Sequence, residues 1–217
     1  MHNLDPSRRR LAAGLAALAG YVDAVGFLSA DRYFVSFMSG NTTRLATELV
    51  VSPATAVIPA LLIAGFVLGS AAGAFVRHKA GRWRKPGVLA LVTALLGIGA
   101  GLGLAGQVAA MMGCLVLAMG ALNNAVESNG APIALTYLTG ALVRMGQYLG
   151  DRLARREGPP VAAPVALWLS LSAGAATGAS LFVAFGPVSL ILACAASAAM
   201  TLIGARLASR AIANPQS

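Results

Sequence analysis

The chain has 217 residues, of which 58% are hydrophobic and only 11% are charged, and its mean hydropathy is +0.76. A soluble domain usually carries roughly 25% charged residues, so this composition excludes an ordinary water-soluble fold. The net charge of +9 would suggest nucleic-acid binding in a soluble chain. In a membrane protein, however, Lys and Arg gather in cytoplasmic loops. We therefore expect an all-α, polytopic membrane protein in a lipid bilayer that binds no nucleic acid.

The N-terminal basic run is followed directly by an apolar segment. Arg8, Arg9 and Arg10 resemble the start of a secretory or twin-arginine signal. The apolar run nevertheless continues into Asp23 without a clean small-x-small cleavage site. The sequence therefore predicts an uncleaved first helix that three cytoplasmic arginines hold in place.

Apolar stretches about twenty residues long, without the alternation of a barrel strand, predict about six transmembrane helices. Their ranges are 11–28, 54–76, 87–106, 108–126, 161–184 and 188–205. Two intervening stretches, 31–50 and 131–150, are too polar for an ordinary span. Each is expected to be either a re-entrant half-helix or an amphipathic helix in the membrane plane.

The basic residues test this number of spans. With six spans and a cytoplasmic N-terminus, all of the 16 basic residues except Arg32 and Arg44 fall on the cytoplasmic side. If both polar stretches crossed the membrane, the basic cluster at 77–85 would face outward, against the positive-inside rule. The charges therefore favour six spans with both termini in the cytoplasm.

The two halves of the chain resemble each other. Residues 36–40 read hydroxyl, aromatic, apolar, hydroxyl and Gly, followed by Arg44, and the same order returns at 136–140, followed by Arg144. Each half would hold three spans, so the halves would lie in opposite orientations, as is common in secondary transporters. The predicted membrane domain covers residues 1–217, with repeats at about 8–106 and 108–210.

Two motifs point to a known family. Gly-Tyr-Val-Asp-Ala at 20–24 and Phe-Val-Ser-Phe-Met-Ser-Gly-Asn-Thr-Thr at 34–43 resemble the YoaK family, also called DUF1275. Asn-Asn-Ala at 123–125 and Leu-Thr-Tyr-Leu-Thr-Gly at 135–140 resemble its second pair of motifs. The chain departs at Asn123, where the family typically has Gln, and at Ser39, where it often has Thr. The resemblance covers nearly the whole chain and implies a small multi-span protein of the bacterial inner membrane, with no established activity.

Polar residues inside the predicted bundle are the candidates for function. An acid such as Asp23 within a span usually faces a cavity or a partner, so it could couple a proton or cation or bind substrate. Alternatively, it reaches the interface or pairs with Arg44. Asn123 and Glu127 share a helix face, and with Asp23 they would line one cavity, or Asn123 would instead hold helices together.

The glycine-centred segments are the second group of candidates. A helix that starts near Gly40 or Gly140 would direct N–H groups toward an anion, whereas the alternative is an ordinary N-cap. Arg44 and Arg144 would neutralise that anion, snorkel to headgroups or pair with Glu48 and Glu127. The predicted cavity-lining set is Asp23, Ser39, Gly40, Asn41, Thr42, Arg44, Asn123, Asn124, Glu127, Thr139, Gly140 and Arg144.

Three function classes remain after these observations. A small secondary transporter for a small polar or anionic solute is the leading hypothesis, and a non-transporting structural or partner-binding protein is the alternative. An intramembrane enzyme would need a pair such as Asp23 with Glu127, and we expect no enzyme, metal or cofactor because no hydrolase or Cys/His pattern is present. The small-xxx-small stripes fit packing within the chain or between two subunits of a homodimer.

Overall fold

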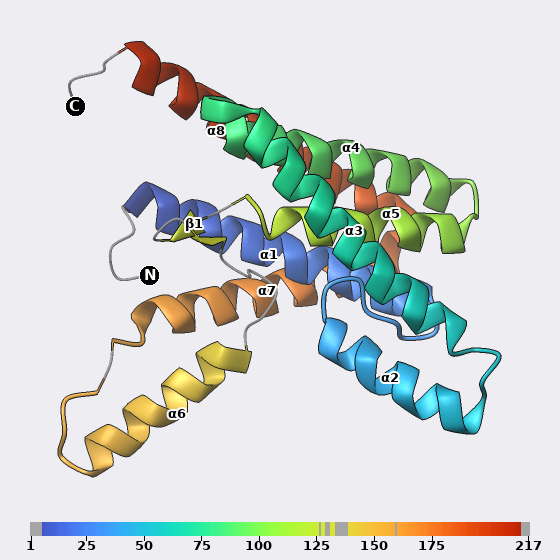
Figure 1. The fold of residues 1–217 in the computed structure, drawn as a ribbon, viewed down its shortest axis with the longest axis horizontal. Coiled ribbons are helices and arrows are strands. Elements are labelled where there is room, and N and C mark those ends of the chain that lie inside the picture. The colour runs from blue at the N-terminus through green and yellow to red at the C-terminus, as the bar shows by residue number, and fades with distance from the viewer. Residues whose placement is uncertain (1–5, 126, 129–130, 133–138, 159, 214–217) are drawn as a thin grey trace.

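The computed structural model describes residues 6–125, 127–128, 131–132, 139–158 and 160–213 as a bundle of helices (Figure 1). The strand structure in these residues is one antiparallel pair of two-residue strands. The elements are α1 Pro6–Ser29, α2 Met38–Val51, α3 Val57–Lys79, η1 Gly81–Trp83, α4 Arg84–Leu104, α5 Val108–Leu122, β1 Glu127–Ser128, β2 Ala131–Pro132, α6 Thr139–Leu153, α7 Ala162–Phe185, η2 Gly186–Val188 and α8 Ser189–Ala213.

The predicted helical class is confirmed, and a helix lies over each predicted span. The helix over the fourth predicted span, α5, ends at Leu122 rather than near 126, because the chain turns at the two asparagines that follow it. Each of the two polar stretches contributes one amphipathic helix, α2 and α6. Within the described part of the chain, four helical stretches are long and apolar enough to cross a membrane: Arg9–Ser29, Val57–Lys79, Gly81–Leu104 and Ala162–Arg206.

Glycines let two pairs of helices pack backbone to backbone, α1 on α7 and α3 on α5. A Cβ atom at Gly174 would overlap the Ala17 carbonyl, and a Cβ atom at Gly69 would overlap the Leu117 carbonyl. Ala17 and Leu117 occupy matching places in the two halves of the sequence, as do Gly69 and Gly174. The structure therefore makes the same helix crossing twice, and we call these two places the glycine crossings.

The match extends along both glycine crossings. Gly20 approaches the Leu171 carbonyl, just as Gly120 approaches the Phe66 carbonyl. Gly178 lies on Tyr21, and Gly73 lies on Ala121, one turn further along each pair. Because contacts advance in the same direction on both partners, α1 runs parallel to α7 and α3 runs parallel to α5. These small-xxx-small stripes are therefore filled from within the chain.

The interior is apolar and the outer face is apolar as well. Leu15, Leu96 and Met119 are fully buried, whereas Leu61 and Leu68 on α3 are 65% and 63% exposed. A soluble protein rarely exposes such contiguous apolar surface. This outer face is suited to lipid.

Polar side chains join α4 to α8 inside the bundle. The Thr93 hydroxyl lies 2.8 Å from the Ser197 hydroxyl and 3.2 Å from that of Thr201. Cys194 also contacts the Thr93 carbonyl, at 3.6 Å. Hydrogen bonds of this kind hold helices together where water is excluded.

The ends of the bundle differ in what they carry. The N-terminal end of α1, the connection between α3 and α4, α6 and the C-terminal end of α8 lie at the left of Figure 1. Helix α2 and the connection between α4 and α5 lie at the right. The basic cluster at 77–85 and the basic end of α6 therefore share the left end with the first turn of α1 and the last turn of α8.

Candidate functional site

Asp23 is the anchor of the loop that follows α1. Its Oδ1 atom accepts hydrogen bonds from the backbone N–H groups of Val35 and Ser36, both at 2.8 Å. The chain turns back through Asp31 and Arg32, whose φ angles of 39° and 60° lie in the left-handed region. The loop therefore folds back along α1, and its polar backbone groups are satisfied by a carboxylate of the helix.

Asn41 holds the same loop from the other side. Its side chain is fully buried, its Nδ2 donates to the Phe34 carbonyl at 2.7 Å, and its Oδ1 accepts from the Phe34 N–H at 3.1 Å. Gly40 lies against the Phe34 and Phe37 rings, where a Cβ atom would clash. These residues therefore fix the loop to the first turn of α2.

The start of α2 differs from both sequence-based alternatives. The helix begins at Met38, with no side-chain cap, and the N–H groups of Gly40 and Asn41 donate to the Phe37 carbonyl. Ser39 and Thr42 are exposed, and the Thr42 hydroxyl donates to the Met38 carbonyl at 2.9 Å. The predicted polar segment thus splits into a buried half, made by Asn41, and an exposed hydroxyl half.

Arg44 closes the outer side of the loop. Its guanidinium lies 3.2 Å from the Glu48 carboxylate, stacks 3.7 Å from the centre of the Tyr33 ring and donates to the Asp31 carbonyl at 2.6 Å. The Tyr33 hydroxyl also donates to Glu48, at 2.8 Å. Of the two partners considered for Arg44, the structure selects Glu48 rather than Asp23.

Two asparagines of the predicted set, Asn123 and Asn124, lie at the other glycine crossing. Asn124 is buried at the end of α5, and its Nδ2 donates to the Ser70 carbonyl of α3 at 3.0 Å. Asn123 donates to the Met119 carbonyl of its own helix, also at 3.0 Å. These contacts hold α5 to α3 and finish the helix, and they are not shared with Asp23.

The remaining candidates lie on or before α6. Thr139, Gly140 and Arg144 belong to its first two turns, where Thr139 and Arg144 are exposed. Glu127 belongs to β1, and its side chain lies outside the described residues, as does the segment 133–138. The proposed pairing of Asp23 with Glu127 therefore stays a prediction.

A cavity lies directly beside Asp23. It has a volume of about 370 Å³ and is formed between α1 and α7, with Phe27, Phe34 and Leu171 among its lining residues. Asp23 thus faces this cavity while one of its oxygens holds the loop. The carboxylate is the residue of the predicted set that combines a place inside a span with a place on a cavity wall.

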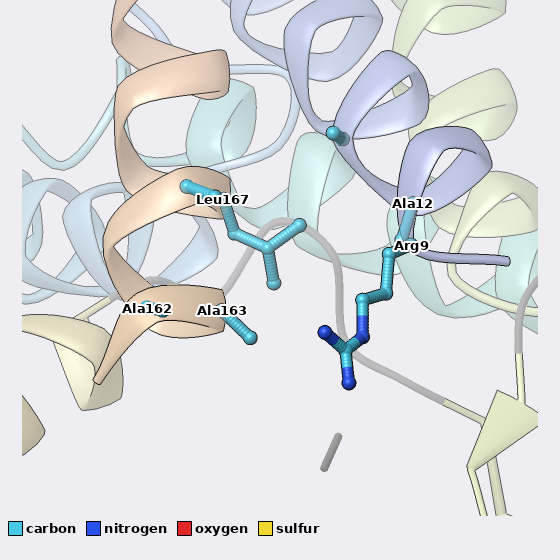
Figure 2. Close-up of a pocket in the computed structure, with 7 residues that line it drawn as sticks. Arg9, Ala12, Ala162, Ala163 and Leu167 are labelled. Carbon is cyan, nitrogen blue, oxygen red and sulfur yellow. The ribbon is translucent and has the colours of Figure 1, made fainter. Parts of the chain in front are cut away.

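Two further cavities occupy matching positions in the two halves. The outer groove, of about 640 Å³, lies between the C-terminal end of α1, the first part of α3 and the first part of α5. The inner pocket, of about 170 Å³, lies between the first turns of α1 and α7. Ala109 and Gly113 line the outer groove. The residues one hundred positions earlier, Arg9 and Ala13, line the inner pocket. In Figure 2 the Arg9 side chain extends from α1 toward the mouth of the inner pocket, facing Ala163 and Leu167 of α7.

Sequence reasoning missed the outer groove and the anchors around it. Asp31 and Tyr33 had no role in the predicted site. The available signal was Gly113 on α5, where a Cβ atom would meet open space. In the described part of the chain, no group of three His, Cys, Asp or Glu side chains is placed to hold a metal ion.

Comparison with known proteins gives the family. Residues 11–203 match the family described as "Protein of unknown function (DUF1275)". The chain is 38% identical over 191 residues to "UPF0700 transmembrane protein RA0705" of Rhizobium meliloti (strain 1021), covering 84% of this chain and 82% of that protein. No solved structure matches the chain. The chain is therefore a membrane protein that belongs to the DUF1275 family.

Proposed function

We propose that this protein is a small secondary transporter of the bacterial inner membrane for a small polar or anionic solute. The observation that carries the proposal is Asp23, an ionisable group inside a span that lines a cavity and holds a loop. Intramembrane acids are costly, and they commonly mark ion or substrate pathways. Protonation of Asp23 would weaken its two bonds to the loop, which links a proton to the position of residues 33–36.

The proposal includes six spans arranged as two inverted halves. Helices α7 and α8 have 24 and 25 residues, so each reaches roughly 36 Å, more than the roughly 30 Å hydrocarbon core. Helix α5 is shorter, with 15 residues, but nine of them are buried within the protein. The parallel pairs at the glycine crossings support this arrangement, because an inverted three-span repeat makes α1 and α7 cross in the same direction.

Alternating access would then expose the cavity beside Asp23 to one side of the membrane at a time. The inner pocket and the outer groove belong to the two glycine crossings, one at each end of the bundle. Rocking of one half against the other would open one end while closing the other. Arg9 beside the inner pocket favours an anionic solute from the cytoplasm.

Transport is tested with the full chain in proteoliposomes, against a panel of small carboxylates, phosphate and polar neutral solutes, with and without a proton gradient. We expect gradient-dependent flux of at least one solute. In the Asp23→Asn variant this flux is lost, because the amide cannot release a proton. Gly101→Leu is the matched control, since the added side chain meets open space on α4. An absence of flux from the parent protein across the panel, together with no proton movement, would contradict the proposal.

The topology has a separate test. Single cysteines at Ala54 and Arg82, both exposed and in the segments that flank α3, are introduced after Cys114 and Cys194 are replaced by alanine. A membrane-impermeant maleimide added to intact cells with a permeabilised outer membrane should label position 54 and leave position 82 unlabelled. Labelling of both or of the opposite site would overturn the proposed orientation with cytoplasmic termini.

A second function is supported by the same loop. Asp23 and Asn41 are both engaged by the backbone at 34–36, as in a protein whose polar residues serve folding alone. Such a protein would bind a partner or a second copy of itself, and because the glycine stripes are filled internally a homodimer would use another surface. In that case Asp23→Asn would leave every function intact, since the amide oxygen can still accept both bonds.

A further inference from the structure

The outer groove is an apolar channel with one polar end. Its walls are aliphatic over most of its length, with Leu61, Leu68, Met112 and Val116 facing one another across α3 and α5. Its volume of about 640 Å³ lies in the range of sites that hold small organic ligands. The groove meets the exposed apolar face of α3, so it opens sideways toward lipid rather than along the bundle.

The polar end is built by the loop after α1. Asp31 and Tyr33 line it, and Asp31 is exposed at the rim. The Arg44 guanidinium contacts the Glu48 carboxylate and the Tyr33 ring, and it donates to the backbone carbonyl of Asp31. Among the residues that line the groove, Asp31 is the one that carries a charge.

The aliphatic walls of the groove and the negative charge at its mouth together favour one class of ligand. We propose that the outer groove binds an ethanolamine phospholipid of the surrounding membrane, with an acyl chain between α3 and α5 and the ammonium group at Asp31. The aliphatic walls fit a hydrocarbon chain, and a carboxylate at the mouth fits an ammonium group. An anionic lipid such as phosphatidylglycerol would place its phosphate near Asp31 without an ammonium group to offset the repulsion between the two negative charges.

Helix α2 puts this mouth at the level of headgroups. Its exposed residues include Leu49, Val50 and Val51, next to the polar face that carries Arg44 and Glu48. An amphipathic helix of this kind lies in the interface between headgroups and acyl chains. The loop that joins α1 to α2 therefore holds Asp31 where a lipid ammonium group is found. This site does not depend on the proposed transport.

The test uses the full chain, purified in mild detergent and incubated with mixed micelles of phosphatidylethanolamine and phosphatidylglycerol in equal amounts. Native mass spectrometry then counts the lipids that stay bound. We expect phosphatidylethanolamine to be retained about threefold over phosphatidylglycerol, the ratio that one exposed charge pair supports. Asp31→Asn should bring the ratio to parity, and asparagine is also a residue that tolerates the left-handed backbone at this position.

Two further variants test the groove itself. Gly113→Leu fills it, because a Cβ atom there meets open space, whereas Gly101→Leu adds the same side chain in open space on α4, away from the groove. Gly113→Leu should lose the retained phosphatidylethanolamine and Gly101→Leu should keep it. Ala109→Leu, one turn before Gly113, provides a second filling variant if the first fails to fold. Equal retention of both lipids by the parent, or retention unchanged by filling, would overturn the proposal.

Discussion

The outer groove and the inner pocket occupy matching places in the two halves, yet they differ in size and in charge. The outer groove is lined by Leu, Ile and Met and ends at Asp31, whereas alanines make up most of the inner pocket, which ends at Arg9. Small side chains let two helices approach closely, which leaves the smaller space between α1 and α7. The two glycine crossings therefore share close backbone contacts, but the residues at the rims of their cavities differ in size and charge.

The largest effect is expected from breaking a glycine crossing. Gly174→Leu places a side chain into the Ala17 backbone, and Gly69→Leu does the same at Leu117. Because neither neighbour is a flexible side chain, each change should destabilise the fold by about 3 kcal/mol or more. Thermal unfolding in detergent measures the loss. If the two crossings are equivalent, both variants should have melting temperatures far below that of Gly101→Leu. A variant with the same melting temperature as Gly101→Leu would show that its crossing is not essential.

A smaller effect separates the two roles of Asp23. Asp23→Ala leaves the N–H groups of Val35 and Ser36 without their acceptor, which should cost about 2 kcal/mol. Asp23→Asn keeps an acceptor oxygen and should retain most of that stability. Hydrogen exchange at Val35 and Ser36 is the sharpest measurement, since both amides should exchange faster in the alanine variant than in the asparagine variant. Equal protection in all three proteins would mean that the loop is held by Asn41 instead.

The smallest effect concerns the rim of the outer groove. Burial raises the pKa of the Tyr33 hydroxyl above its ordinary 10.0, and the hydrogen bond to Glu48 raises it further. The folded protein therefore favours the neutral phenol, so this contribution to stability is intact below pH 10 and is lost as the pH rises through the raised pKa. Tyr33→Phe should cost about 1 kcal/mol at neutral pH. Melting curves from pH 8 upward should show a steeper alkaline decline in the parent than in Tyr33→Phe.

The helices could be predicted from the sequence because hydropathy is a local property. The stretch predicted at 161–184 is α7, Ala162–Phe185, and the stretch at 54–76 lies over α3. The glycine stripes were also visible, since a spacing of four residues places them on one face of a helix. What spacing could not provide was the identity of the helix that each stripe contacts.

The site was harder to predict, because a polar side chain inside a bundle can pair with any of several groups, and the sequence does not say which. Asp23 was recognised as an intramembrane acid, but its partners proved to be the backbone N–H groups of Val35 and Ser36 rather than Arg44. Asn41 was recognised as polar, but its complete pairing with Phe34 depends on the left-handed turn at Asp31 and Arg32. Such pairings involve backbone groups, which every residue type carries, so composition and spacing give no signal for them.

The sequence by itself determined that this chain belongs in a membrane and that it forms apolar helices joined by two amphipathic ones, and it predicted that its halves repeat. These properties follow from the hydropathy and spacing of residues close together in the chain. Only the tertiary structure decided that α1 pairs with α7 and α3 with α5, that Arg44 pairs with Glu48, and that an apolar groove ends at Asp31. These properties arise where segments far apart in the chain meet, and the free energy of close packing selects one partner among several that the sequence permits.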